Sequence, residues 1–183
     1  MDTIRAWTKQ HKGVLENIKK NGRHTAKKEF IHQSEEAMLT IDTYDWLVGE
    51  LVKISSPPAD ADYPIWISLK RDATMLISPN TVIMELEIPA DIVTYLNIPK
   101  WTAVNNYSYI PLDEEDKKRH TELLKMYGTC DVKACMTEFY PEIKREIHES
   151  WSRVFDDSIK IGNDNAYGLI WEIKKDWIKN IWY

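Results

Sequence analysis

The first candidates for chemistry are aromatic rings grouped around a carboxylate. Tyr44, Asp45 and Trp46 are consecutive, and a carboxylate between two rings at the start of a helix is suited to binding a ligand's hydroxyls. The pattern also has a structural explanation, in which Asp45 stabilises the helix dipole and Trp46 fills the core. Trp66 presents a similar choice between a stacking platform and a ring that caps the core. These residues therefore predict either a concave aromatic site or the centre of the core.

Charged side chains offer two further candidates. Glu85 and Glu87 alternate along a strand-like stretch, so they share a face. Two like charges side by side raise the pKa of one carboxyl and would suit general acid/base work, whereas a solvated strand face is the structural alternative. Arg153 is suited to clamping a phosphate or carboxylate bidentately, or to an ion pair with Asp156 or Glu149.

Other kinds of site are not indicated. The five histidines are scattered, and His120 and His148 lie on charged helical stretches where we expect them to be solvated. Glycine-rich phosphate loops are absent, which argues against a Rossmann or P-loop enzyme. Cys130 and Cys135 have no histidine or cysteine partner at metal-ligand spacing, so we expect reduced thiols, no metal and no disulfide framework.

Periodicity predicts the elements that must position these residues. We expect strands over 3–10, 63–70, 81–88 and 165–173, a helix ending at Gly22, further helices over 42–54, 113–127 and 138–155, a surface loop or lid over 23–36, and a strand or helical turn over 176–183. Ile143, Ile147, Trp151 and Val154 form one stripe, which we expect to pack on the sheet. The prediction is an α+β fold, a single compact domain over residues 1–183 with a central mixed or antiparallel sheet flanked by helices.

Composition narrows the class of protein. The chain has 183 residues, 43% of them hydrophobic and 29% charged, which is typical of a globular domain with its own core. The net charge of −5 argues against a protein whose main task is to hold a nucleic-acid backbone, while it leaves room for a local basic patch. The N-terminal residues do not resemble a signal peptide, and no apolar stretch is long enough to span a membrane. We therefore expect a cytoplasmic protein.

A series of sequence blocks resembles one known family. The blocks are Trp7-Thr8-x-Gln10, Tyr44-Asp45-Trp46-Leu47, Tyr63-Pro64-Ile65-Trp66, Glu85-Leu86-Glu87-Ile88-Pro89, Asn105-Asn106-Tyr107, Ser150-Trp151-x-Arg153-x-Phe155-Asp156 and Trp171-Glu172. In this order they resemble a bacterial and phage family catalogued only as a domain of unknown function. The resemblance implies a small cytoplasmic domain and brings no catalytic residue with it.

A looser resemblance is to compact ADP-ribosyltransferases, which hold NAD with a polar residue on the first strand and use a late glutamate in catalysis. By this resemblance Glu172 would be catalytic and NAD the cofactor, with Arg5 and an aromatic residue, Tyr44 or Tyr63, beside it. The residues expected to bind the cofactor are Arg5, Thr8, Gln10, Tyr44, Asp45, Trp46, Trp66 and Arg153.

Two functions remain open at this stage. One is an NAD-consuming transferase, a toxin or effector acting on nucleic acid or protein. The other is a non-catalytic binding module, in which Tyr44, Trp46 and Trp66 form a stacking pocket for a nucleotide, a base or another small ligand. Neither function requires a membrane. Convergence of Arg5 and Glu172 in one cleft would favour the transferase.

Overall fold

The computed structural model describes residues 2–28, 41–71 and 77–183. The chain divides into two compact units, one formed by Met1–Tyr95 with Ala166–Tyr183 and the other by Leu96–Asn165. The prediction of a single domain over 1–183 stays a prediction, and each unit is described separately below.

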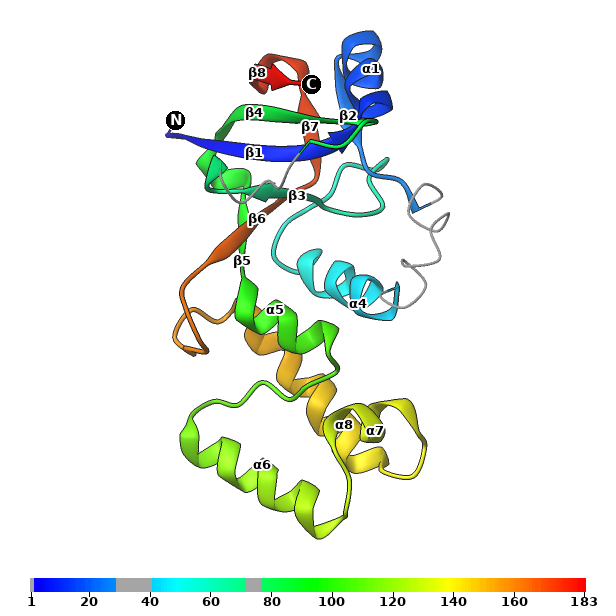
Figure 1. Cartoon of the computed structure of the whole chain (residues 1–183), viewed down its shortest axis with the longest axis vertical. Coiled ribbons are helices and arrows are strands. Elements are labelled where there is room, and N and C mark those ends of the chain that lie inside the picture. Colours follow the sequence, from blue (N-terminus) through cyan, green and yellow to red (C-terminus); the bar gives the residue numbers. More distant parts are fainter. Residues whose placement is uncertain (1, 29–40, 72–76) are drawn as a thin grey trace. The chain divides into compact units, whose positions relative to one another are not determined.

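The first unit is built on an antiparallel sheet (Figure 1). Six strands follow the order β5-β6-β3-β1-β4-β8, and β2 and β7 form a separate two-stranded sheet. The bounds are β1 Thr3–His11, β2 Arg23–Thr25, β3 Ile65–Ser68, β4 Thr81–Pro89, β5 Thr94–Asn97, β6 Ala166–Ile170, β7 Glu172–Lys174 and β8 Ile178–Trp182. β1 pairs with β4 over its whole length, from Thr3 opposite Pro89 to His11 opposite Thr81. This arrangement confirms the predicted α+β class.

Side-chain alternation gives the sheet a largely apolar face. Ala6, Ile67 and Leu86 lie in one buried cluster with Leu15 and Ile18 of helix α1, which runs over Lys12–Asn21. Because successive side chains of a strand point to opposite faces, every second residue of β4 from Val82 to Ile88 joins this cluster. Helix α1 therefore covers one face of the sheet.

Helix α1 ends as its sequence predicts. Gly22 adopts a left-handed conformation with φ of 80°, and its amide donates to the carbonyl of Ile18 at 2.8 Å. This is the geometry in which glycine carries no Cβ penalty. The next helix, α4, runs over Ile41–Leu51 and buries Thr43, Leu47 and Leu51. The short helical turns η2 (Ala90–Ile92) and η4 (Lys175–Trp177) precede β5 and β8.

The second unit is helical. Its elements are α5 Ile98–Asn105, α6 Glu114–Met126, α7 Asp131–Met136, α8 Pro141–Ser150 and the 3₁₀ turn η3 Trp151–Phe155. Helix α6 begins after Asp113, whose carboxylate accepts from the amide of Asp116 at 2.8 Å, and is followed by Gly128 at a φ of 59°. The sequence predicts these boundaries to within a residue.

Several elements differ from their predictions. The helix expected over 138–155 is α8 followed by η3, and α7 is an additional helix before it. The strand expected over 165–173 is divided into β6 and β7 at Trp171, whose indole donates to Ser55 Oγ at 2.9 Å. The predicted stripe of α8 and η3 is buried, but it is covered within the second unit, where α8 packs on α7 and Trp151 lies against Tyr107. The loop or lid predicted over 23–36 begins instead as strand β2, which pairs with β7. Residues 29–36 lie outside the described residues.

Candidate functional site

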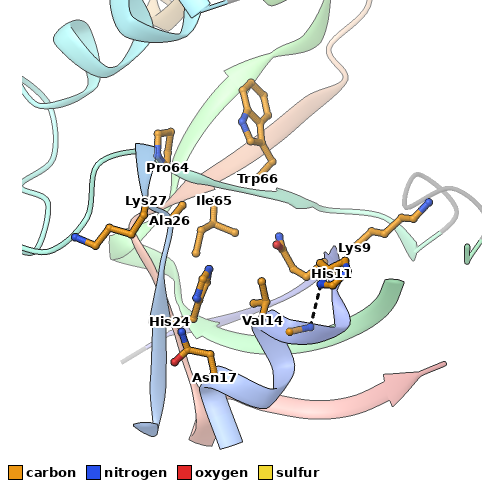
Figure 2. Close-up of a pocket in the computed structure, with 12 residues that line it drawn as sticks. Lys9, His11, Val14, Asn17, His24, Ala26, Lys27, Pro64, Ile65 and Trp66 are labelled. Atoms are coloured by element: carbon orange, nitrogen blue, oxygen red, sulfur yellow. Dashed lines mark hydrogen bonds between the residues drawn. The ribbon is translucent and has the colours of Figure 1, made fainter. Parts of the chain in front are cut away.

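One candidate site is a cavity of about 820 Å³ beside helix α1 in the first unit (Figure 2). Four pieces of structure enclose it, namely the end of β1, the first half of α1, β2 with the residues after it, and the start of β3. The lining residues are Lys9, Gln10, His11, Gly13, Val14, Asn17, His24, Ala26, Lys27, Pro64, Ile65 and Trp66.

The junction of β1 and α1 sets the floor of the cavity. The chain passes from strand to helix without a loop, and His11 caps the helix by accepting from the amide of Gly13 at 3.1 Å through Nδ1. A Cβ at position 13 would lie 3.2 Å from that same nitrogen, so glycine leaves room for the cap. Val14 and Asn17 follow at a spacing of three, which places both on the side of α1 that faces the cavity.

His24 brings an unsatisfied polar atom to the cavity wall. Its Nδ1 is buried and has no hydrogen-bond partner among the residues that the structure describes. Figure 2 shows the ring in the space between Ile65 and Asn17. Burial lowers the pKa of His24 below its ordinary value, so the ring is neutral near pH 7. An unsatisfied buried group costs about 1–3 kcal/mol, and a ligand that bonded to Nδ1 would remove that cost.

Three of the residues predicted to bind a cofactor are joined by hydrogen bonds at the cavity edge. Gln10 Nε2 donates to Thr8 Oγ1 at 2.8 Å, and Thr8 Oγ1 donates to the carbonyl of Trp66 at 2.8 Å. Thr8 is buried, so this relay fixes the Gln10 amide at the wall. Gln10 and Trp66 line the cavity, whereas Thr8 supports them from behind.

The ring of Trp66 does not form the inner wall. Ile65 and Trp66 are neighbours on β3 and therefore point to opposite faces of the sheet, as Figure 2 shows. On the face away from α1, the Trp66 ring lies 5.5 Å from Tyr167 and 6.0 Å from Tyr44, and Tyr44 lies 6.4 Å from Tyr63. These edge-on and tilted contacts are typical of packed aromatic clusters.

Asp45 and Trp46 lie on α4, next to this cluster. Asp45 accepts from the Tyr63 hydroxyl through one oxygen and from Lys28 Nζ at 3.2 Å through the other. Burial first, and then the Asp45 carboxylate, raise the pKa of Tyr63. The Asp45 carboxylate therefore ties α4 to the segments before and after it, while Trp46 is half-buried. Neither residue lines the cavity described above.

The charged side chains among the described residues that line the cavity are all positive. Its charged lining side chains are Lys9 and Lys27, and none of the described lining residues is acidic. In Figure 2 both lysine side chains extend toward the rim, at opposite ends of the cavity. In a chain of net charge −5, this local imbalance favours an anionic ligand.

Arg5 and Glu172, the pair expected in a transferase, are each engaged elsewhere. Arg5 Nε pairs with Glu85 at 3.1 Å. Glu172 accepts from Arg23 at 2.8 Å and Lys174 at 3.2 Å. Burial alone would raise the pKa of Glu172, but these two hydrogen bonds outweigh it and hold the pKa below its ordinary value. Neither Arg5 nor Glu172 is among the described residues that line the cavity.

The carboxylates of β4 do not form the acid/base pair considered above. Glu85 is buried and also accepts from Asn180 at 2.7 Å. Exposed Glu87 accepts from Lys179 and Thr3, each at 3.1 Å. Those two contacts, with Lys179 first, lower the pKa of Glu87, whereas a repelling pair would raise it. A solvated strand face, the structural alternative, describes Glu87, which is exposed, but does not describe Glu85, which is buried.

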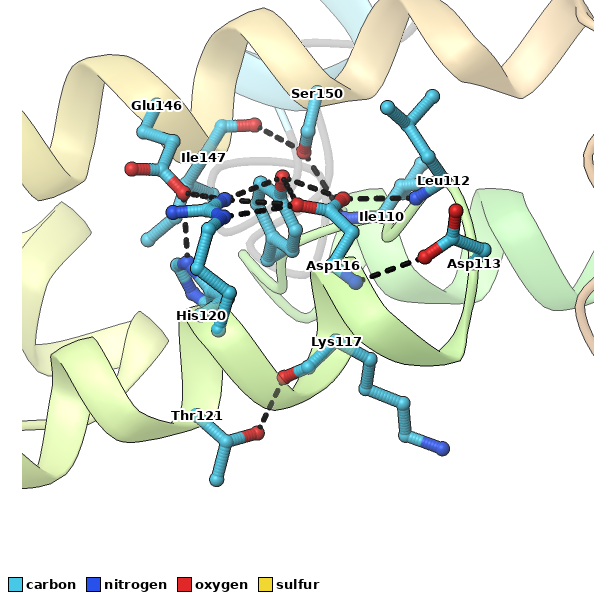
Figure 3. A network of polar contacts seen from close by, with 12 residues as sticks. Ile110, Leu112, Asp113, Asp116, Lys117, His120, Thr121, Glu146, Ile147 and Ser150 are labelled. Carbon is cyan, nitrogen blue, oxygen red and sulfur yellow. Dashed lines mark hydrogen bonds and ion pairs between the residues drawn. The ribbon is translucent and has the colours of Figure 1, made fainter.

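Arg153 belongs to a dense polar network in the second unit. Figure 3 shows the part of this network around Asp116, His120 and Glu146. Arg153 Nη1 pairs with Asp116 at 3.2 Å and also donates to the Tyr109 hydroxyl at 3.1 Å and to the carbonyl of Ile110. The ion pair predicted with Asp156 or Glu149 therefore forms with Asp116 of α6 instead. Burial alone would raise the pKa of Asp116, but hydrogen bonds from Leu112, Tyr109 and Arg119 lower it to about 2.

His120, which we expected to be solvated, lies at the centre of this network. The residue is only 4% exposed. Its Nε2 lies 2.8 Å from Asp131, and its Nδ1 lies 3.0 Å from Glu146. Its ring stacks on Tyr109 at 4.0 Å with an interplanar angle of 11°. His120 and Asp131 also line a second cavity, of about 630 Å³. Because both ring nitrogens are already bonded, the network is a structural clasp between α6, α7 and α8.

Nearly the whole chain matches one known family. Residues 5–179 match the family described as "Domain of unknown function (DUF3841)". The chain belongs to this family. The match includes the α1 cavity and the His120 network. No curated protein and no solved structure is detectably similar to the chain.

No helix in the described ranges combines the length and apolar character needed to cross a membrane. Over the same ranges, no three histidine, cysteine, aspartate or glutamate side chains are grouped so that they could hold a metal ion. The predicted site residues Thr8, Gln10, Tyr44, Asp45 and Trp66 thus lie in one region of the first unit, while Arg153 belongs to the other unit.

Proposed function

We propose that this DUF3841 chain is a non-catalytic binding protein for a small ligand that has an anionic group and an apolar or planar part, with a nucleotide as the best-matched class. The ligand would occupy the cavity between α1, β2 and β3. The observation that carries the proposal is that His24, one of the residues lining this cavity, has a buried Nδ1 without a partner in the described part of the chain.

The composition of the cavity wall supports this ligand class. A volume of about 820 Å³ lies within the roughly 300–1,000 Å³ usual for small-molecule sites. Val14, Ala26, Pro64 and Ile65 supply apolar surface for a base, and Gln10 and His24 supply few, fixed polar groups. The lysines at the rim match a phosphate or carboxylate of the ligand.

A transferase is less well supported by the same geometry. Its chemistry needs a carboxylate beside the nicotinamide ribose, but the Glu172 carboxylate is bonded to Arg23 and Lys174. The guanidinium of Arg5 forms an ion pair with Glu85. NAD is therefore treated as one nucleotide ligand to be tested beside others, with Trp66 and Tyr44 supporting the site from the opposite face of the sheet.

Isothermal titration calorimetry with AMP, ADP, NAD and inorganic phosphate tests the proposal. We expect saturable binding of at least one nucleotide and weaker binding of phosphate. His24→Phe keeps the ring volume and removes the nitrogen, so it should weaken binding about tenfold, the equivalent of one hydrogen bond. Val14→Phe should weaken binding by placing a larger side chain in the cavity. His148→Phe, at an exposed position of α8, is the matched control and should bind as the wild type does.

Two results would overturn the proposal. If none of the four compounds binds, or if Val14→Phe binds them normally while it remains folded, the cavity is not the binding site. Release of nicotinamide from NAD, lost in Glu172→Gln, would replace the binding module with the transferase.

A further inference from the structure

The surface next to the cavity carries a concentration of positive charge. Residues 2–28 contain eight lysines and arginines but only two acidic residues, Asp2 and Glu16. The chain as a whole has the opposite balance, with 24 basic and 29 acidic residues. Such an asymmetry within one chain is typical of contact with a polyanion.

The fold brings distant lysines to the same place. Lys19 and Lys20 occupy the last turn of α1. The carbonyl of Gly22, which caps that turn, accepts from the amide of Lys175 at 2.8 Å. Lys175 comes from the C-terminal part of the chain, and this backbone hydrogen bond places it beside the end of α1.

In the part of the chain that the structure describes, the lysines around the end of α1 make no ion pair. Lys12, Lys19, Lys20 and Lys175 are exposed, and within the described ranges the ion pairs of this region are made by Arg23 and Lys174 instead. Lys12 begins α1 at the cavity, and Lys19 follows it about 10 Å along the helix axis at 1.5 Å per residue. The positive charge therefore extends away from the cavity along α1.

We propose that the ligand of the cavity is one nucleotide of a single-stranded nucleic acid, and that Lys12, Lys19, Lys20 and Lys175 contact the phosphates of its neighbours. This inference rests on the proposed function of the same cavity. A base can enter the cavity only when it is unstacked, which selects a single strand over a duplex. The lysines supply the sequence-independent electrostatic part of the affinity.

An anionic membrane surface fits the same charges less well. Peripheral membrane binding adds buried apolar side chains to the electrostatic attraction. The large apolar side chains that are exposed in the described part of the first unit are Val52, Ile54, Ile77, Tyr95 and Tyr183. None of them belongs to α1, β2 or η4, so this surface has charge without an apolar anchor.

Fluorescence anisotropy with a labelled oligothymidylate of about 12 nucleotides tests the inference, in parallel with ADP binding by calorimetry. We expect the logarithm of the association constant to fall linearly with the logarithm of the salt concentration. Each phosphate contact should add about 0.7 to the magnitude of this slope. The triple variant Lys19→Gln, Lys20→Gln, Lys175→Gln should reduce the slope by about 2 and leave ADP binding unchanged. The matched control is Lys117→Gln, Lys118→Gln, Lys125→Gln on exposed faces of α6, which should leave both unchanged.

Results that contradict this inference can be distinguished from results that contradict the proposed function. Normal ADP binding without oligothymidylate binding would overturn this inference and leave the proposed function standing. Absence of both would remove the proposed function as well. An unchanged salt slope in the Lys19, Lys20 and Lys175 variant would refute the role of these lysines. Binding to phosphatidylserine vesicles without binding to the oligonucleotide would replace the nucleic acid with a lipid surface.

Discussion

Removal of His120 should open the second unit. The imidazole connects three helices, because it lies on α6 and bonds to Asp131 of α7 and Glu146 of α8. Each charge-assisted hydrogen bond contributes about 1.5–3 kcal/mol. Both carboxylates keep another donor, since Glu146 retains Arg119 at 2.6 Å and Asp131 retains the amide of Tyr109 at 2.9 Å. We therefore expect His120→Ala to lower the free energy of opening α6 by about 2–4 kcal/mol, less than the simple sum.

The pH dependence of this contact has a definite sign. Burial alone would lower the pKa of His120, but the hydrogen bonds to Asp131 and Glu146 outweigh it and raise the pKa above its ordinary 6.5. Folding therefore favours the protonated ring, so the stabilisation is complete below about pH 6.5 and is lost as pH rises through the folded-state pKa. Above that pKa only one ring nitrogen carries a proton, and the other presents a lone pair to a carboxylate.

Other charged groups surround His120 and limit the effect. The ring of Tyr109 stacks on His120. The Tyr109 hydroxyl donates to Asp116 and accepts from Arg119, both on α6, and it also accepts from Arg153 of η3. Asp116 acts in the opposite direction, because its pKa is lowered from 3.8 to about 2. The stability that the Asp116 carboxylate contributes is present above pH 3.8 and is lost as pH falls toward 2. The clasp should therefore be tightest between these two ranges.

Amide hydrogen exchange of α6 peptides, corrected for intrinsic exchange rates, measures this opening directly. Wild-type protein should lose protection in α6 as pH rises above about 6.5 and through the raised folded-state pKa of His120, and His120→Ala should be less protected with little dependence on pH. The matched control His148→Ala removes an exposed histidine of α8 and should behave as the wild type does. Equal pH dependence in wild type and His120→Ala would refute the argument.

Three further substitutions test packing, each by its thermal midpoint and denaturant midpoint. Trp151→Ala should cost about 3–5 kcal/mol as a large-to-small core change, whereas Phe139→Ala, at a side chain 83% exposed, should cost little; equal midpoints for the two variants would contradict the burial of Trp151. Gly168→Ala should cost about 1–3 kcal/mol, because its Cβ would lie 2.6 Å from Ile67 Cγ1; wild-type stability would show that β3 and β6 are further apart. Gly22→Ala should cost about 1 kcal/mol for its positive φ, and a stabilised variant would mean that α1 does not end in a left-handed cap.

Elements with long, regular patterns were predictable from sequence. Strand β1, strand β4 and the ends of α1 and α6 follow from alternation and from glycine or aspartate at the boundaries. Helix α7 has only six residues, too few for a helical period to show. The break between β6 and β7 depends on a tertiary contact between Trp171 and Ser55, which are 116 residues apart. No local pattern could reveal it.

The candidate site was predictable only in part. Thr8, Gln10 and Trp66 share a hydrogen-bonded edge, yet the alternation of β3 already implied that the rings of Trp66 and the side chain of Ile65 face opposite ways. His24 lies in a stretch that we expected to be a loop or lid, and its missing partner is a property of the folded environment. His120 looked solvated because its neighbours in sequence are charged, while its partners are 11 and 26 residues away.

The most direct test of the binding site is the ¹⁵N NMR signal of His24 Nδ1 during a titration with ADP. We predict that the signal moves and saturates at the dissociation constant measured by calorimetry, because the ligand supplies the missing hydrogen bond of a nitrogen that is buried without a partner among the described residues. The histidines outside the cavity, His120 and His148, should keep their signals. Saturation of ADP binding with an unchanged His24 signal, or no binding at all, would contradict the assignment of the cavity beside α1 as the functional site.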